Sequence, residues 1–146
     1  MVIAQAYALY NHHIIRDRIF VILKKLCKAK CEESIFTSHN YISVWEEFPM
    51  LRKGAVEAKA GERFCLPFNM RDGIVICVGK GNPEWNFSAP HGAGRAMSRN
   101  AARKNVRMED FAKSMDGIFS TSVCLETLDE SPQAYKPMEE ILRLIE

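Results

Sequence analysis

Residues 66–99 read LPFNMRDGIVICVGKGNPEWNFSAPHGAGRAMSR, and this stretch decides the expected fold. Its first half predicts two strands, residues 64–68 and 74–78, on either side of a tight loop. The second strand is a continuous apolar run, which predicts burial on both faces. A long loop rich in Gly, Asn and Pro, residues 79–90, then leads into a helix expected over residues 95–105.

Helices are expected on both sides of this stretch. Residues 2–30 predict one long helix, because Ile15, Ile19, Ile22 and Leu26 recur at the spacing of a stripe that a helix buries. The remaining elements are β-like pieces in 35–45, a polar turn-like segment at 52–63, a helix near 109–115, a strand near 118–124, a turn at 129–132 and a final helix near 137–145. This order predicts a single compact α+β unit, with a mixed or antiparallel sheet, surrounding helices, and a helix first and last.

Composition excludes several classes of protein. The chain has 146 residues, 47% hydrophobic and 26% charged, which fits one globular domain and excludes disorder, collagen and coiled coil. The apolar runs fall far short of the ~20 residues of a membrane-spanning helix. No basic segment precedes an apolar stretch at the start, and the five Cys are an odd number. These features predict a reduced, cytoplasmic protein whose Cys27 and Cys31 are incidental thiols rather than metal ligands.

Charge is distributed unevenly along the chain. Residues 1–108 hold 17 Lys and Arg against 9 Asp and Glu, whereas residues 109–146 hold 3 against 9. A basic body with an acidic end could meet an anionic partner such as phosphate, but charge alone favours an ordinary solvated surface.

The segment around His91 is the first candidate for chemistry. Gly92 and Gly94 flank an alanine at the expected helix start, where free backbone N–H groups attract phosphate. Arg95 and Arg99, four residues apart, share one face of the expected helix and suit phosphate oxygens. His91 precedes this cradle, and a neutral imidazole held against a phosphate can form a phosphoramidate. The alternative is a Gly-rich turn with an exposed histidine.

Two further segments are candidates. His39 is a common type of metal ligand and Asn40 can bind phosphate or hold its neighbour, but a His-Asn pair is also frequent in ordinary turns. The loop at residues 67–73 either wraps a nucleotide or simply turns the chain.

Several ordered motifs resemble one family. Residues 66–99 closely resemble the RtcB family of GTP-dependent RNA ligases, in particular its bacterial branch. Residues 39–42 (HNYI) resemble its His-Asn-Tyr motif, and residues 51–55 (LRKGA) its Arg-Lys-Gly-Ala segment. Residues 127–136 (TLDESPQAYK) and 4–11 (AQAYALYN) resemble its Asp-Glu-x-Pro-x-Ala-Tyr-Lys and Tyr-Ala-x-x-Asn segments. The resemblance therefore covers nearly the whole chain.

The resemblance implies a role for each matching residue. His91 matches the histidine that attacks the α-phosphorus of GTP; the GMP would pass to an RNA 3′-phosphate, and a 5′-hydroxyl would displace it, in tRNA splicing or RNA repair. His39 matches a ligand of the family's paired Mn²⁺ ions, which would neutralise the triphosphate. Arg95 matches a phosphate-binding arginine. The residues that match the lining of the GTP pocket are Asn40, Pro67, Phe68, Asn69, Met70, Gly92, Ala93 and Gly94.

Family members are much longer, so the resemblance implies that residues 1–146 are the C-terminal segment of an RtcB-like ligase domain. The expected upstream part carries a metal-binding Cys, an Asn-His-Phe-type motif and a His-Ser-Gly-Ser-Arg motif, and a guanine-contacting Lys is expected beyond residue 146. Within the chain, His12 replaces a usual Arg, and Ile74 stands where a small polar residue is common.

Three hypotheses follow from the sequence. The first is an RNA ligase segment that uses GTP and Mn²⁺. The second is a non-catalytic fragment that binds nucleotide or RNA phosphate weakly through a group of basic residues, Arg95, Arg99, Arg103, Lys104 and Arg107. The third is one half of a split ligase, in which a separate polypeptide brings the missing ligands and docks on the apolar first helix.

Overall fold

The computed structural model describes residues 2–44 and 48–145, and its contacts divide the chain into two compact units, Met1–Ile35 and Phe36–Glu146. This differs from the single compact unit that the sequence predicts. The expected β-like piece that ends at Trp45 lies partly outside the described residues. Among the residues described, no helix combines the length and the apolarity that crossing a bilayer demands.

The first unit is dominated by helix α1 (Val2–Cys27), which confirms the long helix expected there. The helix ends three residues early because Lys28 adopts a left-handed conformation, with φ +53°. The stripe expected to be buried is not: Ile15, Ile19 and Ile22 are each about half exposed, and Leu26 is 79% exposed.

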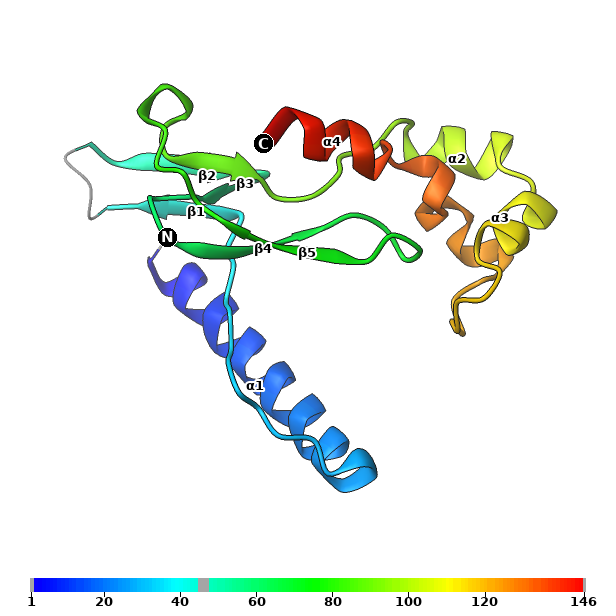
Figure 1. Cartoon of the computed structure of the whole chain (residues 1–146), viewed down its shortest axis with the longest axis horizontal. Helices are drawn as coiled ribbons and strands as arrows, with labels where there is room; N and C mark the ends of the chain where they lie inside the picture. Colours follow the sequence, from blue (N-terminus) through cyan, green and yellow to red (C-terminus); the bar gives the residue numbers. More distant parts are fainter. Residues whose placement is uncertain (1, 45–47, 146) are drawn as a thin grey trace. The chain divides into compact units, whose positions relative to one another are not determined.

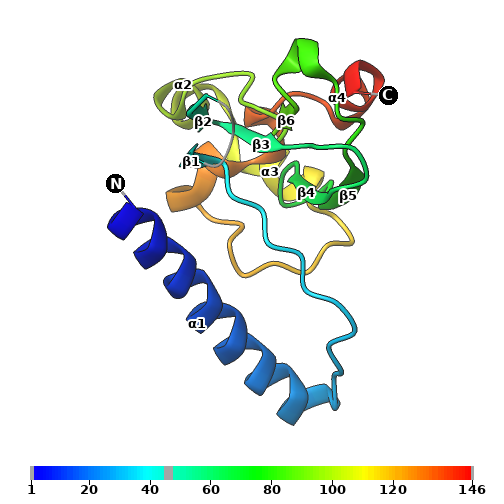
Figure 2. The same ribbon diagram turned by 90° about the vertical axis from the view of Figure 1, so that its left-hand side faces the viewer.

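In its described residues, 36–44 and 48–145, the second unit contains three antiparallel two-stranded ribbons (Figures 1 and 2). They pair β1 (Asn40–Ser43) with β2 (Met50–Lys53), β3 (Ala55–Glu57) with β6 (Ser88–Pro90), and β4 (Arg63–Pro67) with β5 (Ile74–Val78). The α+β class is therefore confirmed, the described strands pair antiparallel, and β4 and β5 match the two strands expected from the sequence.

Two expectations about strands are wrong. The β5 strand is covered on one face only, since Ile74, Ile76 and Val78 are each more than half exposed. The polar segment 52–63 overlaps the end of β2 and contains β3, and the loop 79–90 contains β6 together with a 3₁₀ turn at Pro83–Trp85. Their polar and glycine-rich composition hides strands because these strands are only three or four residues long, too short to show an alternating pattern.

Helices form the rest of this unit. Helix α2 (Arg99–Asn105) begins four residues later than expected, where the Ser98 side chain accepts the N–H of Ala101 as an N-cap. Helices α3 (Met108–Ser114) and α4 (Met138–Ile145) confirm the two other helices.

The expected strand near 118–124 is wrong, because these residues form an irregular loop in the described structure. The turn expected at 129–132 is replaced by two 3₁₀ helices, Leu125–Glu130 and Pro132–Ala134. Figure 1 shows α2 and α3 at the end of this unit away from β1 and β2.

Among the described residues, apolar packing holds the elements in place through three clusters of buried side chains. One joins β4 to α4 through Leu66, Phe68 and Ile141. The others centre on Val56 with Phe64, and on Phe111 with Leu128. The first cluster includes Ala93, two residues after His91, and Ala89, two residues before His91, packs against the second.

Candidate functional site: a histidine pair across a glycine

Strand register brings His39 and His91 to the same glycine. In the β1–β2 ladder Asn40 pairs with Lys53, and one step further the Gly54 N–H donates to the His39 carbonyl at 2.8 Å. In the β3–β6 ladder Ala55 pairs with Pro90, which places His91 at the next position opposite Gly54. Gly54 is thus the junction between two ladders, and residues 52 positions apart in the chain become neighbours.

The two imidazole rings are stacked. Their centroids lie 4.9 Å apart and their planes are inclined by 15°. Both histidines are exposed, as is Asn40, whose Oδ1 accepts the Gly54 N–H at 3.3 Å. We call His39, Asn40, Gly54 and His91 the histidine site.

A single hydrogen bond fixes the tautomer of neutral His91. Its Nδ1 lies 2.7 Å from the Gly54 carbonyl oxygen. Because a carbonyl oxygen can only accept, Nδ1 must carry the proton, and the lone pair of the neutral ring then resides on Nε2. The ring is therefore oriented with its nucleophilic nitrogen away from the backbone that holds it.

Sequence reasoning missed Gly54, which it placed in a turn-like segment. Its φ is +68°, a conformation that favours glycine. A Cβ at this position would lie 3.4 Å from His91 Cε1 and 3.5 Å from Nδ1, at the edge of ordinary contact. The one available signal was its position in the Arg-Lys-Gly-Ala segment, since composition alone does not distinguish a turn from a junction of strands.

Several residues expected to line a nucleotide pocket have side chains that are buried or already engaged within the protein. The Ala93 N–H donates to the Pro67 carbonyl at 3.2 Å, so the loop after β4 lies beside the loop that follows His91. The side chains of Phe68 and Ala93 are buried in the core, which leaves only their backbones to contact a ligand.

Asn69 is engaged in its own loop, where its side chain accepts the N–H groups of Arg71 and Asp72 and donates to the Asp72 carboxylate. Met70 packs against the Phe111 cluster. Gly94 has a φ of +71° and Gly92 approaches the Pro67 carbonyl so closely that a Cβ would lie 3.0 Å from it. The glycine segment therefore allows close backbone approach, but in a loop that ends five residues before the start of α2 rather than at a helix start.

Arg95 and Arg99 do not share a helical face. Arg95 precedes α2, forms an isolated bridge with Tyr135, and stacks over the Tyr135 ring at 5.0 Å. Its guanidinium also donates to the Asp129 carbonyl. The two arginines nevertheless converge, because both lie against Glu130.

A set of ion pairs surrounds this contact, and we call it the arginine–carboxylate cluster. The Asp129 side chain, only 3% exposed, accepts Arg99 at 2.6 Å and Arg103 at 3.1 Å. Hydrogen bonds from Arg99 and then Arg103 hold the pKa of Asp129 below its usual range. The members of the cluster are Arg95, Arg99, Arg103, Asp129, Glu130 and Tyr135.

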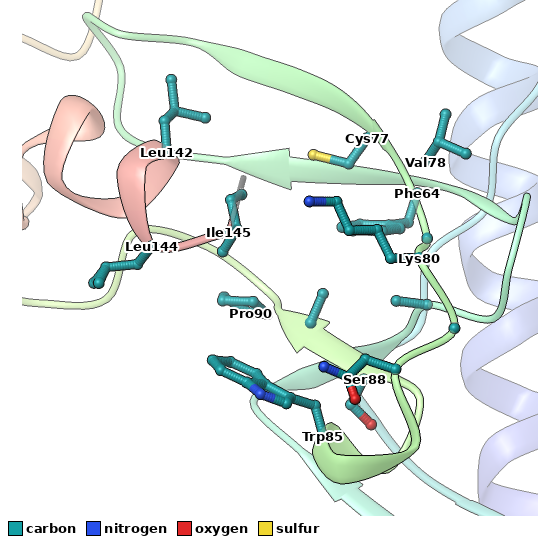
Figure 3. A pocket seen from close by; sticks show the side chains of 15 residues that line it. Phe64, Cys77, Val78, Lys80, Trp85, Ser88, Pro90, Leu142, Leu144 and Ile145 are labelled. Atoms are coloured by element: carbon teal, nitrogen blue, oxygen red, sulfur yellow. The ribbon is translucent and has the colours of Figure 1, made fainter.

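A cavity of about 400 Å³ lies between β4–β5, β6 and the end of α4 (Figure 3). Its walls are mainly apolar and include Phe64, Trp85, Pro90 and Leu142, with the Lys80 side chain among them. None of the residues expected to bind the nucleotide lines this cavity. The nucleotide expectation therefore rests on the open surface beside His91.

Comparison with known proteins decides the family. The model of the family described as tRNA-splicing ligase RtcB matches residues 1–146. This chain belongs to the RtcB family. The RNA-splicing ligase RtcB of Escherichia coli K12 is 31% identical over 95% of this chain and 36% of its own length. The tRNA-splicing ligase RtcB of Methanopyrus kandleri is 35% identical over 55% of this chain and 9% of its own length.

The chain thus spans about a third of the length of the Escherichia coli RtcB. This share bears on the metal that the RtcB resemblance implies. Among residues 2–44 and 48–145, no group of three His, Cys, Asp or Glu side chains is placed to hold a metal ion. His39 and His91 supply two imidazoles, too few for a manganese ion, which prefers several oxygen and imidazole ligands. The described residues by themselves do not form the metal site.

Proposed function

We propose that this chain forms the guanylate-accepting C-terminal part of an RtcB-type RNA ligase, which joins RNA 3′-phosphate and 5′-hydroxyl ends using GTP. The observation that carries the proposal is the histidine site: His91 is held through Nδ1 by Gly54, stacked on His39, and exposed. Family membership supports the reaction class.

In the proposed first step His91 Nε2 attacks the α-phosphorus of GTP. A P–N bond forms, the bond from the α-phosphorus to the bridging oxygen breaks, and pyrophosphate leaves. The GMP then passes to the RNA 3′-phosphate, and the 5′-hydroxyl displaces GMP as the strand is sealed. The Gly54 carbonyl supports the first step because it accepts a hydrogen bond from Nδ1–H and stabilises the positive charge that develops on the ring.

We propose that the nucleotide contacts Asn40 and two backbone segments close to His91. Asn40 lies at Gly54, and the backbones of residues 67–70 and 92–94 lie beside each other through the Ala93–Pro67 hydrogen bond. Glycines at 92 and 94 let a phosphate approach the main chain closely. Arg95 is proposed to orient the phosphates by exchanging the Glu130 carboxylate, 3.7 Å from its guanidinium, for a phosphate oxygen of GTP.

We further propose that His39 contributes one ligand to a Mn²⁺ site. The remaining donors must come from outside the described residues, since these hold no three-ligand group. A separate polypeptide, or further residues of a longer chain, would supply them. The exposed apolar residues of α1, among them Ile3, Tyr7 and Leu26, offer a surface on which such a partner can dock.

The structure weighs against weak phosphate binding as the sole function. Of the five basic residues that this alternative needs, Arg95, Arg99 and Arg103 are engaged by Asp129 and Glu130, and Arg107 pairs with Glu109. An RNA phosphate would have to displace these carboxylates, which lowers the net attraction.

The test is covalent labelling of the purified chain with α-labelled GTP and Mn²⁺. Label that is stable to alkali, lost in acid and absent in His91→Ala is the expected result, either in the chain alone or after a polypeptide that supplies the other RtcB motifs is added. His13→Ala, a histidine on α1, is the matched control and is expected to keep the label. A folded chain that takes no label even with the added part would overturn the proposal.

A further inference from the structure

We propose that Arg52 is a positioning residue that fixes the histidine pair. This inference rests on the proposed function, because the placement of His91 matters most if its Nε2 is the nucleophile. Arg52 lies on β2, two residues before Gly54, and is only 2% exposed. A buried guanidinium needs a specific set of partners to offset its desolvation.

The guanidinium of Arg52 spans both ladders that meet at Gly54. Its Nε donates to Ser88 Oγ at 3.0 Å on β6, and its Nη1 donates to the Tyr41 hydroxyl at 3.4 Å on β1. Its Nη2 donates to the Asn86 carbonyl at 3.2 Å in the turn before β6. Three nitrogens of one planar group therefore reach three segments of the chain.

Each of these contacts lies close to a residue of the histidine site. Tyr41 follows His39 by two residues, and Ser88 precedes His91 by three. A shift of β6 relative to β2 would move His91 Nδ1 off the Gly54 carbonyl, and a shift of β1 would move His39 out of the stack. Arg52 opposes both shifts, because it joins β1 and β6 through a single side chain.

Charge around the group completes the arrangement. The Tyr41 hydroxyl donates to Glu57 Oε2 at 3.2 Å, and Glu57 also pairs with Lys59. Although burial acts in the opposite direction, Lys59 and Arg52 lower the pKa of Glu57, so the carboxylate stays charged beside the guanidinium. Lysine carries the same charge but lacks the planar fork, so it cannot reach all three acceptors at once.

The test reads the tautomer of His91 by ¹⁵N NMR in the full chain, about two pH units above the usual imidazole pKa of 6.5. The wild-type ring is expected to give the Nδ1–H signature. Arg52→Met is expected to convert it to the Nε2–H form that free imidazole side chains favour, and Arg52→Lys is expected not to restore it. Arg143→Met, the same change at an exposed position on α4, is expected to leave the wild-type spectrum.

Two milder variants keep the inference testable if Arg52→Met does not fold. Tyr41→Phe and Ser88→Ala each remove one acceptor of the guanidinium and are expected to give a smaller change in the same direction. If the folded Arg52→Met chain, or both mild variants, retain the wild-type His91 tautomer, the inference is wrong.

Labelling separates this inference from the proposed function. Under conditions where the wild type takes the GTP label, Arg52→Met is expected to slow labelling by about 100-fold, the loss that a displacement of about 1 Å can cause. A variant that labels at the wild-type rate overturns the positioning role alone. A wild type that never labels but shows the tautomer change overturns the nucleophile proposal and leaves the Arg52 contact intact.

Discussion

The histidine site is assembled by backbone register, whereas the arginine–carboxylate cluster is assembled by side-chain charge. In the first, Gly54 joins two ladders and its N–H and C=O groups hold His39 and His91. In the second, Asp129 and Glu130 gather arginines from α2 and from the loop before it.

This difference predicts different sensitivities. Backbone hydrogen bonds between neutral groups respond little to salt, so the strand pairing that sets Gly54 between His39 and His91 is expected to be insensitive to ionic strength. Ion pairs with partly exposed arginines are screened by salt and depend on the charge of the carboxylates. The two regions can therefore be perturbed separately.

The largest expected effect on stability comes from removing the apolar packing beside the arginine–carboxylate cluster. Phe111 is fully buried beside Leu128, next to Asp129. Phe111→Ala is expected to lower the free energy of unfolding by about 3–5 kcal/mol, measured by urea denaturation. The His91 tautomer is expected to persist in the folded fraction, since the histidine site lies outside the helices that contain Phe111 and Leu128.

Phe119→Ala is the matched control, because Phe119 is 94% exposed and its loss should change stability little. Equal destabilisation by the two variants, or loss of the His91 signature in Phe111→Ala while the chain is folded, would show that the two regions are not separate.

A smaller effect is expected from a methyl group at the junction of the ladders. Both Gly54 and Gly61 have positive φ, so alanine at either position should cost about 1–2 kcal/mol in unfolding free energy. Only at Gly54 does the added Cβ meet His91; at Gly61 it meets nothing within 4 Å. Because the Gly54 carbonyl also holds His91 Nδ1, backbone strain in Gly54→Ala should disturb the His91 tautomer, whereas strain in Gly61→Ala should not. If both variants keep it, the glycine is not what places the ring.

The dependence of stability on acid pH tests whether charge holds the arginine–carboxylate cluster together. Because Arg99 and Arg103 lower the pKa of Asp129, its stabilising effect is present above the usual Asp pKa of about 3.9 and is lost as the pH falls through the lower folded value. Asp129→Asn should thus lower the melting temperature near neutral pH, and the difference from wild type should shrink below about pH 4. The exposed Asp116→Asn variant should show neither change. A difference that is constant with pH would contradict the charge-based account.

The smallest effect concerns the network that Arg52, Tyr41 and Glu57 form beside the histidine site. Burial, together with Glu57 and against the influence of Arg52, raises the pKa of Tyr41 to about 12. Since the unfolded phenol ionises at about 10, stability from this group is present below that pH and lost as the pH rises toward 12. Tyr41→Phe should remove a phenolate absorbance step near pH 12. An unchanged high-pH titration would place Tyr41 outside the network.

Local patterns in the sequence predicted the elements whose structure depends on near neighbours. Three local signals predicted the correct element: the apolar periodicity of α1, the apolar runs of β4 and β5, and Pro137 ahead of α4. The same patterns failed for β2, β3 and β6, because such short strands exist only through their partners. They also overestimated the burial of β5, since an apolar run does not reveal which of its faces is covered.

The sequence by itself determined the family and the candidate residues, His39 and His91, because the order of motifs and the chemistry of a side chain do not depend on tertiary contacts. Only the tertiary structure decided that these histidines stack across Gly54, and that Arg95 and Arg99 meet at Glu130 instead of along a helix. The physical reason is that register and ion pairing join residues tens of positions apart, and no local propensity encodes which distant partner each one finds.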